Sequence, residues 1–146
     1  MTVGDEQRLF FALWPPEALQ AALAEQARQA LAGHRGRAVP AANLHITLAF
    51  LGATAPADRA CYERAADTLA GRPGFSLVLD HLEFHRRRGM LWAQPAEVPQ
   101  ALLDLARALG EALEACGRAP EQRPFRAHVT LARKAAGLPR TQPMTP

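Results

Sequence analysis

The stretch His45-Ile46-Thr47-Leu48-Ala49 (HITLA) occurs a second time near the C-terminal end as His128-Val129-Thr130-Leu131-Ala132 (HVTLA). In both copies apolar residues alternate with His and Thr. A period of two predicts a β-strand with His and Thr on one face and the aliphatic side chains on the other. Two copies with matching aliphatic flanks argue against a chance match, the alternative being two half-buried strands whose polar side chains merely face solvent. We therefore place these two strands at the centre of the fold and of the chemistry.

Length and composition predict one globular domain. The chain has 146 residues, of which 49% are hydrophobic and 21% charged, enough to bury a sizeable core. A formal charge of +3 permits contact with nucleic acid without establishing it. No apolar run approaches the length of a membrane span, and the polar, acidic start MTVGDEQ does not resemble a secretory signal. We expect a cytoplasmic protein without membrane contact.

The cysteine pattern is sparse. Cys61 and Cys116 are the only cysteines, and they lack the Cys-x-x-Cys spacing of zinc sites. Nothing in the sequence indicates a disulfide framework. We expect both to be small core residues.

The order of predicted elements follows from apolar periodicity, prolines and glycines. A buried strand ends at Pro15-Pro16, a helix ends before Gly33, and the first motif strand ends at Gly52. We predict strands at 8–14, 44–51, 75–84 and 90–94, helices at 17–31, 57–70 and 99–116, a loop at 34–42, a basic turn at 85–89, the second motif strand, and a Pro-rich tail at 135–146.

The elements form a repeat. Leu13-Trp14 and Leu91-Trp92 each begin a sequence of prolines, an Ala- and Leu-rich helix, a glycine and a His-x-Thr strand. We predict an α+β fold in which two strand-helix-strand lobes (about 8–82 and 83–134) are related by a pseudo-twofold axis, with mainly antiparallel sheets around a central cleft.

Such a cleft favours acid-base chemistry at phosphorus. Two histidines titrate near neutrality, so one can accept a proton while the other donates one. Thr47 and Thr130 would give neutral hydrogen bonds to phosphate oxygens. In-line displacement needs the nucleophile and the leaving group on opposite sides, which a twofold-related pair provides. This scheme requires no metal and no cofactor.

The paired motifs in LHITLAFLG and PFRAHVTLAR, with the RLFFALWPP start, resemble the 2H phosphoesterase superfamily and its RNA 2',3'-cyclic phosphodiesterases, also called 2'-5' RNA ligases. The resemblance implies an enzyme that opens RNA 2',3'-cyclic phosphates to 2'-phosphomonoesters and can join RNA through a 2'-5' bond. It places catalysis on His45 and His128, with Thr47, Thr130 and Arg133 binding the substrate. Family members usually carry a further strand pair after the second motif, so we expect an open sheet edge, which a second copy could cover; we expect no obligate protein partner.

Other candidates have plainer explanations. Arg126 joins Arg133 beside the second motif, where both could neutralise phosphate oxygens. Arg86 to Arg88 could bind an RNA backbone, but a charged hairpin turn is more often a solvated edge. The aromatic residues Trp14, Trp92 and Phe50 could stack on a base, but are usually core. The remaining histidines, His34, His81 and His85, lack the Thr and are expected at the surface or in the core.

The sequence therefore predicts a metal-independent cyclic phosphodiesterase that acts on RNA ends or cyclic nucleotides. One alternative is a non-catalytic protein that binds RNA termini through the same cleft. A second is a related phosphodiesterase for another cyclic phosphate or for 2'-5' oligonucleotides.

Overall fold

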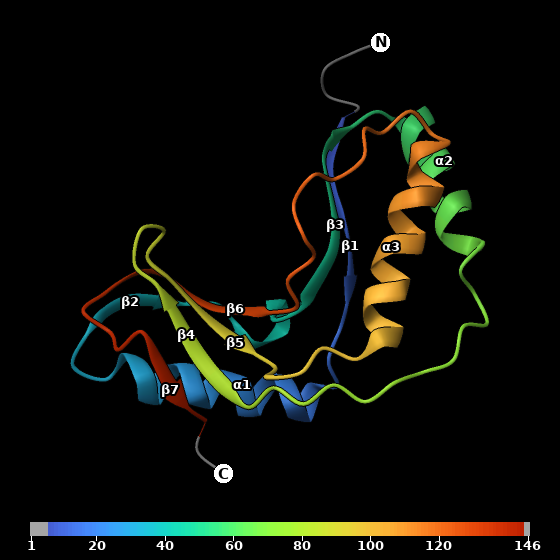
Figure 1. Ribbon diagram of the computed structural model, residues 1–146. Helices are drawn as coiled ribbons and strands as arrows, with labels where there is room; N and C mark the ends of the chain where they lie inside the picture. Colours follow the sequence, from blue (N-terminus) through green and yellow to red (C-terminus); the bar gives the residue numbers. More distant parts are fainter. Residues whose placement is uncertain (1–5, 145–146) are drawn as a thin grey trace. The chain divides into compact units, whose positions relative to one another are not determined.

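The computed structural model describes residues 6–144 and confirms an α+β fold with mainly antiparallel sheets (Figure 1). Its elements are β1 (Gln7–Leu13), α1 (Glu17–Leu31), β2 (Arg35–Ala38), the 3₁₀ turn η2 (Ala41–Asn43), β3 (Ile46–Thr54), α2 (Pro56–Asp67), β4 (His81–His85), β5 (Met90–Gln94), α3 (Gln100–Glu114), β6 (Val129–Ala136) and β7 (Thr141–Pro143).

The chain forms two compact units, each assembled from three separate segments. Of the described residues, one unit, here called the disulfide unit, contains residues 6–12 together with Thr47–Ser76 and Val98–Arg126. The other, the sheet unit, contains Leu13–Ile46, Leu77–Glu97 and residues 127–144. In both predicted repeats a strand precedes the helix and a motif strand follows it, although β2 and η2 intervene between α1 and β3 in the first repeat. Helix α1 of the first repeat, however, belongs to the sheet unit, which holds β5 and β6 of the second repeat. Helix α3 of the second repeat belongs to the disulfide unit, which holds β1 and β3 of the first.

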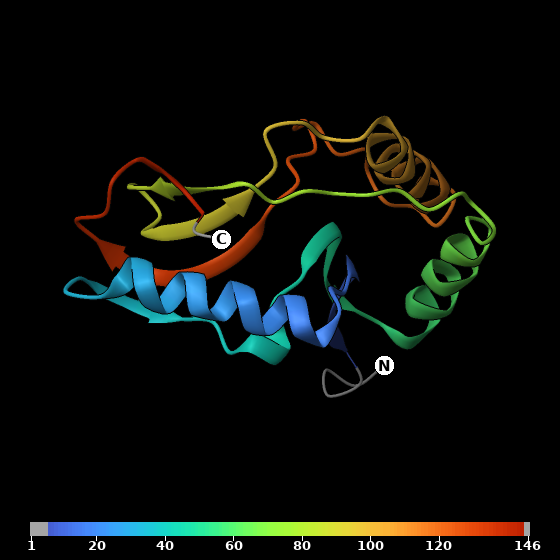
Figure 2. The same ribbon diagram turned by 90° about the horizontal axis from the view of Figure 1, so that it is seen from below.

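The sheet unit is built on five strands in the order β2-β6-β5-β4-β7, and all its neighbouring strands run antiparallel. Helix α1 runs along β2 and β6 (Figure 2) and buries Leu23 and Ala27. Alternation along the strands gives the sheet one face that is aliphatic apart from Phe84, made by Leu82, Phe84, Leu91, Ala93, Val129 and Leu131, all of them buried. The opposite face carries the polar and aromatic side chains of the same strands.

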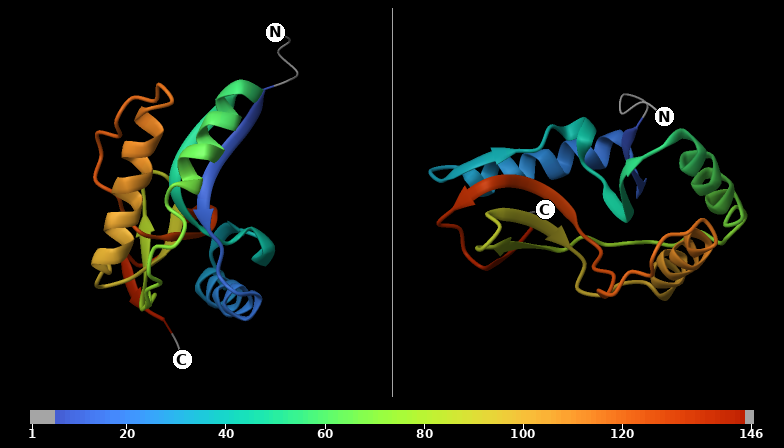
Figure 3. Two further views of the ribbon diagram at one scale, coloured as in Figure 1. Left: turned by 90° about the vertical axis from the view of Figure 1, so that its right-hand side faces the viewer. Right: turned by 90° about the horizontal axis from the view of Figure 1, so that it is seen from above.

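The disulfide unit packs α2 and α3 on the same side of the two-stranded sheet β1-β3 (Figure 3). Its core joins Leu51 of β3, Tyr62 of α2 and Leu109 and Leu113 of α3. Arg118, which follows α3, donates from its guanidinium to the backbone carbonyls of Phe50 (2.9 Å) and Leu51 (3.1 Å). The apolar core and these hydrogen bonds fix the end of α3 against β3.

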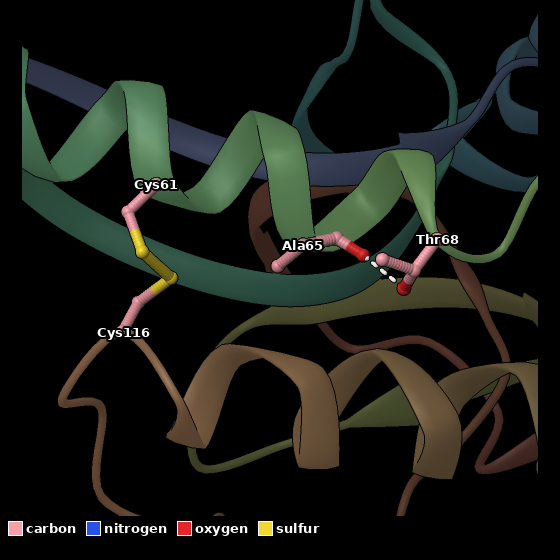
Figure 4. Close-up of a disulfide and its surroundings, with 4 residues drawn as sticks. All are labelled: Cys61, Ala65, Thr68 and Cys116. Atoms are coloured by element: carbon pink, nitrogen blue, oxygen red, sulfur yellow. Dashed lines mark hydrogen bonds between the residues drawn. A yellow bond between two sulfur atoms is a disulfide. The ribbon is translucent and has the colours of Figure 1, made fainter.

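Cys61 and Cys116 form a disulfide, so the expectation of two free core cysteines is wrong (Figure 4). Their Cα atoms lie 5.9 Å apart although 55 positions separate them in the sequence. Packing of α2 against α3 brings the two together. No local spacing rule could have revealed this pairing, because it depends on the contact between two helices.

Two polar segments form strands that the sequence did not predict. Residues 35–38 lie in the predicted loop but pair with β6 as β2, and all four are exposed. Part of the predicted tail forms β7, which pairs with β4 through Thr141 opposite Glu83 and Pro143 opposite His81. Both are short edge strands, where solvated residues and proline are tolerated and apolar alternation is absent.

Two strand boundaries also differ from the prediction. β3 continues through Gly52, whose φ of 70° bends the strand without ending it, and stops at Thr54. Only the last part of the strand predicted at 75–84 is regular, because β4 begins at His81. Ladder hydrogen bonds to β5 and β7, and not side-chain alternation alone, set where β4 starts.

Candidate active site

The second motif lies on β6, between β2 and β5. Val129 and Leu131 are completely buried in the aliphatic face, whereas His128 and Thr130 are half-buried. The predicted separation of polar and aliphatic side chains is therefore confirmed for this strand. His128 precedes the first residue of β6, so its ring stands at the end of the strand, on the polar face.

His128 stacks on Trp92 of β5. The ring centroids are 3.7 Å apart and the planes differ by only 16°. Trp92 is 6% exposed and stands opposite Thr130 in the ladder, so the sheet fixes the indole beside the motif. This contact restricts the rotation of the imidazole and holds the ring in a fixed orientation at the motif.

The first motif is held in place by hydrogen bonds instead of ring stacking alone. His45 follows the turn η2, and its Nδ1 lies 2.7 Å from the carbonyl oxygen of Asn43. A carbonyl only accepts hydrogen bonds, so Nδ1 carries a proton and donates it, which fixes the orientation of the imidazole ring. The side-chain amide of Gln20 donates to the Leu44 carbonyl (3.1 Å) and ties this segment to α1.

A second tryptophan lies beside His45. The ring centroids of Trp14 and His45 are 4.9 Å apart, with planes tilted by 41°. The two Leu-Trp pairs noted in the sequence thus supply an aromatic neighbour to each motif histidine. Trp14 is 56% exposed and Phe50 61% exposed, so the expectation that both are core residues is wrong, whereas Trp92 is core.

The sheet unit contains both motif histidines. Its β2 strand pairs with β6, and the amide of Val39 donates to the carbonyl of Leu131 (2.8 Å), so the segment leading to His45 runs beside the second motif. Thr130 belongs to the same unit. Thr47 is half-buried and begins the β3 segment of the disulfide unit.

Arg126 and Arg133 are both exposed. Arg133 lies on β6 opposite Arg37 of β2, next to an irregularity in the ladder where Lys134 has a φ of 53°. A bulge of this kind redirects neighbouring side chains. Arg126 ends the α3 segment of the disulfide unit, two residues before His128.

Residues 15–144 match the family model described as the 2'-5' RNA ligase superfamily. The chain belongs to this superfamily. The RNA 2',3'-cyclic phosphodiesterase of Escherichia coli K12 is 36% identical over 137 residues, which are 92% of this chain and 76% of the relative. The phosphodiesterase of the same name from Thermus thermophilus is 32% identical, with 94% and 73% covered. These matches confirm the family expected from the two motifs.

Solved structures share the fold of this chain. Escherichia coli LigT complexed with 3'-AMP superimposes with a TM-score of 0.80 at 33% identity and covers 96% of this chain and 80% of its own. The crystal structure of TT0787 from Thermus thermophilus gives a TM-score of 0.77 at 28% identity. The likeness extends over nearly all of the chain.

The sequence did not predict that side chains of β4 contact Trp92, the ring on which His128 stacks. His85 stacks on Trp92 with ring centroids 3.8 Å apart, and Glu83 stands opposite Trp92 in the ladder. A carboxylate oxygen of Glu83 lies 3.8 Å from His85 Nε2 and another lies 4.0 Å from His81 Nε2. The alternation of His81, Glu83 and His85 along one strand was the available signal, since it places all three on the face that carries Trp92.

The carboxylate of Asp80 adjoins this row. It lies 2.7 Å from His81 Nδ1 and accepts the Ala96 amide at 3.2 Å. These hydrogen bonds, chiefly the one from His81, lower the pKa of Asp80. Among residues 6–144 no three His, Cys, Asp or Glu side chains are grouped as metal ligands, and no helix there is long and apolar enough to span a membrane.

Proposed function

We propose that this protein hydrolyses the 2',3'-cyclic phosphate ends of RNA to 2'-phosphomonoesters, with His45 and His128 as an acid-base pair. One observation carries the proposal: both His-x-Thr histidines belong to one compact unit, and each has a tryptophan ring beside it. Membership of the 2'-5' RNA ligase superfamily and relatives named RNA 2',3'-cyclic phosphodiesterase support the same chemistry.

In the proposed reaction His128 accepts a proton from water while the water oxygen attacks phosphorus. The bond from phosphorus to the 3'-oxygen breaks, and His45 gives its Nε2 proton to that oxygen. The products are a 2'-phosphomonoester and a free 3'-hydroxyl, after which proton exchange with solvent restores both rings. The hydrogen bond from His45 Nδ1 to Asn43 supports the acid role, because it orients the ring and makes Nε2 the nitrogen that would give a proton to the leaving group.

The threonines and arginines act on the phosphate oxygens in this scheme. Side chains two apart on a strand are about 6.6 Å apart at the backbone, so His128 and Thr130 can address different oxygens of one phosphate. Thr47 does the same beside His45. Arg126 and Arg133 offset the negative charge that grows in the transition state.

Ligation is a second candidate function, favoured by the family description. The 5'-hydroxyl of another RNA would replace water as the nucleophile, and the same bond to the 3'-oxygen would break, leaving a 2'-5' phosphodiester. The acid-base assignment is unchanged. Only the nucleophile differs between the two reactions.

The test is a short RNA ending in a 2',3'-cyclic phosphate, incubated with the purified protein in EDTA. We expect a 2'-phosphate product, identified by phosphorus NMR, and none from a His45→Ala/His128→Ala variant. A 5'-hydroxyl RNA added to the same reaction tests ligation. Tight binding of the RNA without turnover would instead establish the non-catalytic alternative, and a 3'-phosphate product would contradict the proposed bond cleavage.

A further inference from the structure

We propose that a basic groove in the sheet unit binds the RNA backbone on the 5' side of the cyclic phosphate. This inference rests on the proposed function and extends it to the part of the substrate that does not react. The groove lies between the β4-β5 turn and the β6-β7 connection. Its lining includes His85, Arg86, Arg87, Arg88 and Arg140.

Backbone contacts fix the two walls of this groove. The amide of Ala135 donates to the carbonyl of Gly89 (2.9 Å), and the amide of Phe84 donates to the carbonyl of Arg140 (2.9 Å). Gly89 has a φ of 65°, and a Cβ there would lie 3.2 Å from the Ala135 carbonyl oxygen. The backbone of the β4-β5 turn is therefore fixed, and Arg86, Arg87 and Arg88 extend from fixed backbone positions.

The charge of the groove suits a polyanion. Four arginines line it, all of them exposed, against a single carboxylate, that of Glu83. None of the ion pairs found among residues 6–144 involves these four arginines, whereas Arg28, Arg59, Arg107 and Arg123 each lie beside a carboxylate. Guanidinium groups that are not neutralised within the fold and converge from two segments are typical of phosphate recognition.

Stacked rings connect the lining of the groove to His128. His85 lines the groove and stacks on Trp92, which stacks on His128. The two centroid distances, 3.8 and 3.7 Å, bound the separation of the His85 and His128 ring centroids at 7.5 Å. A span of this size is of the order of one nucleotide of extended RNA. A strand whose cyclic end reaches His128 would therefore pass its preceding phosphates along the arginines, as in other grooves that track a single strand.

This arrangement favours the RNA-binding interpretation of Arg86 to Arg88 over a merely solvated turn. A solvated turn would need neither Arg140 from another segment nor a connection to the catalytic histidine. The expected consequence is a preference for oligonucleotides over cyclic mononucleotides, with the gain carried by the groove.

The test compares cyclic mononucleotides with RNAs of two, four and six nucleotides that end in a 2',3'-cyclic phosphate. We expect kcat/KM of the native protein to rise with length. The variant Arg86→Ala/Arg87→Ala/Arg88→Ala should lose about 10- to 100-fold on the six-nucleotide RNA and keep its activity on the mononucleotide. The slope of log kcat/KM against log salt should become shallower by about 2, because about 0.7 is contributed by each phosphate contact on a single strand.

The matched control is Arg64→Ala/Arg72→Ala/Arg107→Ala, which removes the same charge from exposed positions of the disulfide unit. It should retain the length dependence and the salt slope. Equal losses in both triple variants, or a native protein indifferent to RNA length, would overturn the groove while leaving the cyclic phosphodiesterase intact.

Two further outcomes complete the test. Polyglutamate that competes as strongly as RNA of equal charge would also overturn the groove, since it would indicate a site for acidic protein chains. Absence of turnover on every cyclic phosphate, including the mononucleotide, would instead refute the proposed function itself. The mononucleotide therefore separates failure of the groove from failure of the catalytic proposal.

Discussion

Removing the disulfide should destabilise the protein strongly. The bond joins Cys61 of α2 to Cys116 just after α3 across 55 positions of sequence. A cross-link of that loop length restricts the unfolded chain, and its loss costs about 4 kcal/mol in the chain-entropy model. For a domain of about 150 residues, each kcal/mol shifts Tm by about 2–4 °C. We therefore expect Cys61→Ala/Cys116→Ala to melt about 8–16 °C below the oxidised native protein.

Calorimetry with and without dithiothreitol measures this effect. The reduced native protein should melt near the double variant, and the variant should not respond to the reductant. The chain also offers local reporters, because its single tyrosine, Tyr62, is in the disulfide unit and its two tryptophans, Trp14 and Trp92, are in the sheet unit. Tyrosine and tryptophan signals followed during guanidinium unfolding show whether the loss extends to both units.

Two results would refute this reasoning. Oxidised native protein and double variant with the same Tm would show that the bond does not restrict the unfolded chain as calculated. Two titratable thiols in the unreduced native protein would show that the bond does not form.

Substitutions at four further positions probe the fold and the site. Trp92→Leu removes the ring that stacks on the second motif histidine, so its kcat on cyclic phosphates should fall up to about tenfold, with Trp92→Phe closer to native in the same steady-state assay. Gly110→Ala in α3 should raise the free energy of unfolding by about 0.5–1 kcal/mol, because the new methyl group meets no atom within 4 Å. Gly89→Ala should lower it by about 1–3 kcal/mol, because φ is positive there and a β6 carbonyl lies close; urea denaturation measures both. The pKa of Asp80 is lowered mainly by its hydrogen bond with His81, so its stabilisation is complete above the ordinary carboxyl pKa and is lost as pH falls through the folded-state pKa. Asp80→Asn should remove that part of the acid denaturation curve.

Elements with a complete apolar period were predictable. α1 and α3 show helical spacing with prolines before them, and β6 alternates between buried aliphatic and half-buried polar side chains. β2 and β7 were not predictable in this way. They are edge strands that bury little, so their pairing with β6 and β4 comes from the backbone and leaves no pattern in the side chains.

The site was predictable where the residues repeat and not where tertiary contact defines it. His45 and His128 could be selected as candidate catalytic residues because each lies in the same five-residue pattern. The stacking of His85 on Trp92, and the contact of α2 with α3 that joins the cysteines, link elements whose approach no local pattern encodes. The groove depends in the same way on the meeting of the β4-β5 turn with the β6-β7 connection.

The roles of the two histidines are tested most directly with two substrates that differ in leaving group. A ribose 3'-hydroxyl needs a proton to depart, whereas nitrophenolate leaves without one. On a cyclic phosphate, His45→Ala and His128→Ala should each lose about 10² to 10⁴ in rate and remain folded. On a nitrophenyl phosphodiester we expect His45→Ala to recover and His128→Ala to stay impaired. Recovery of His128→Ala alone would reverse the assignment, and recovery of neither would contradict the acid-base pair.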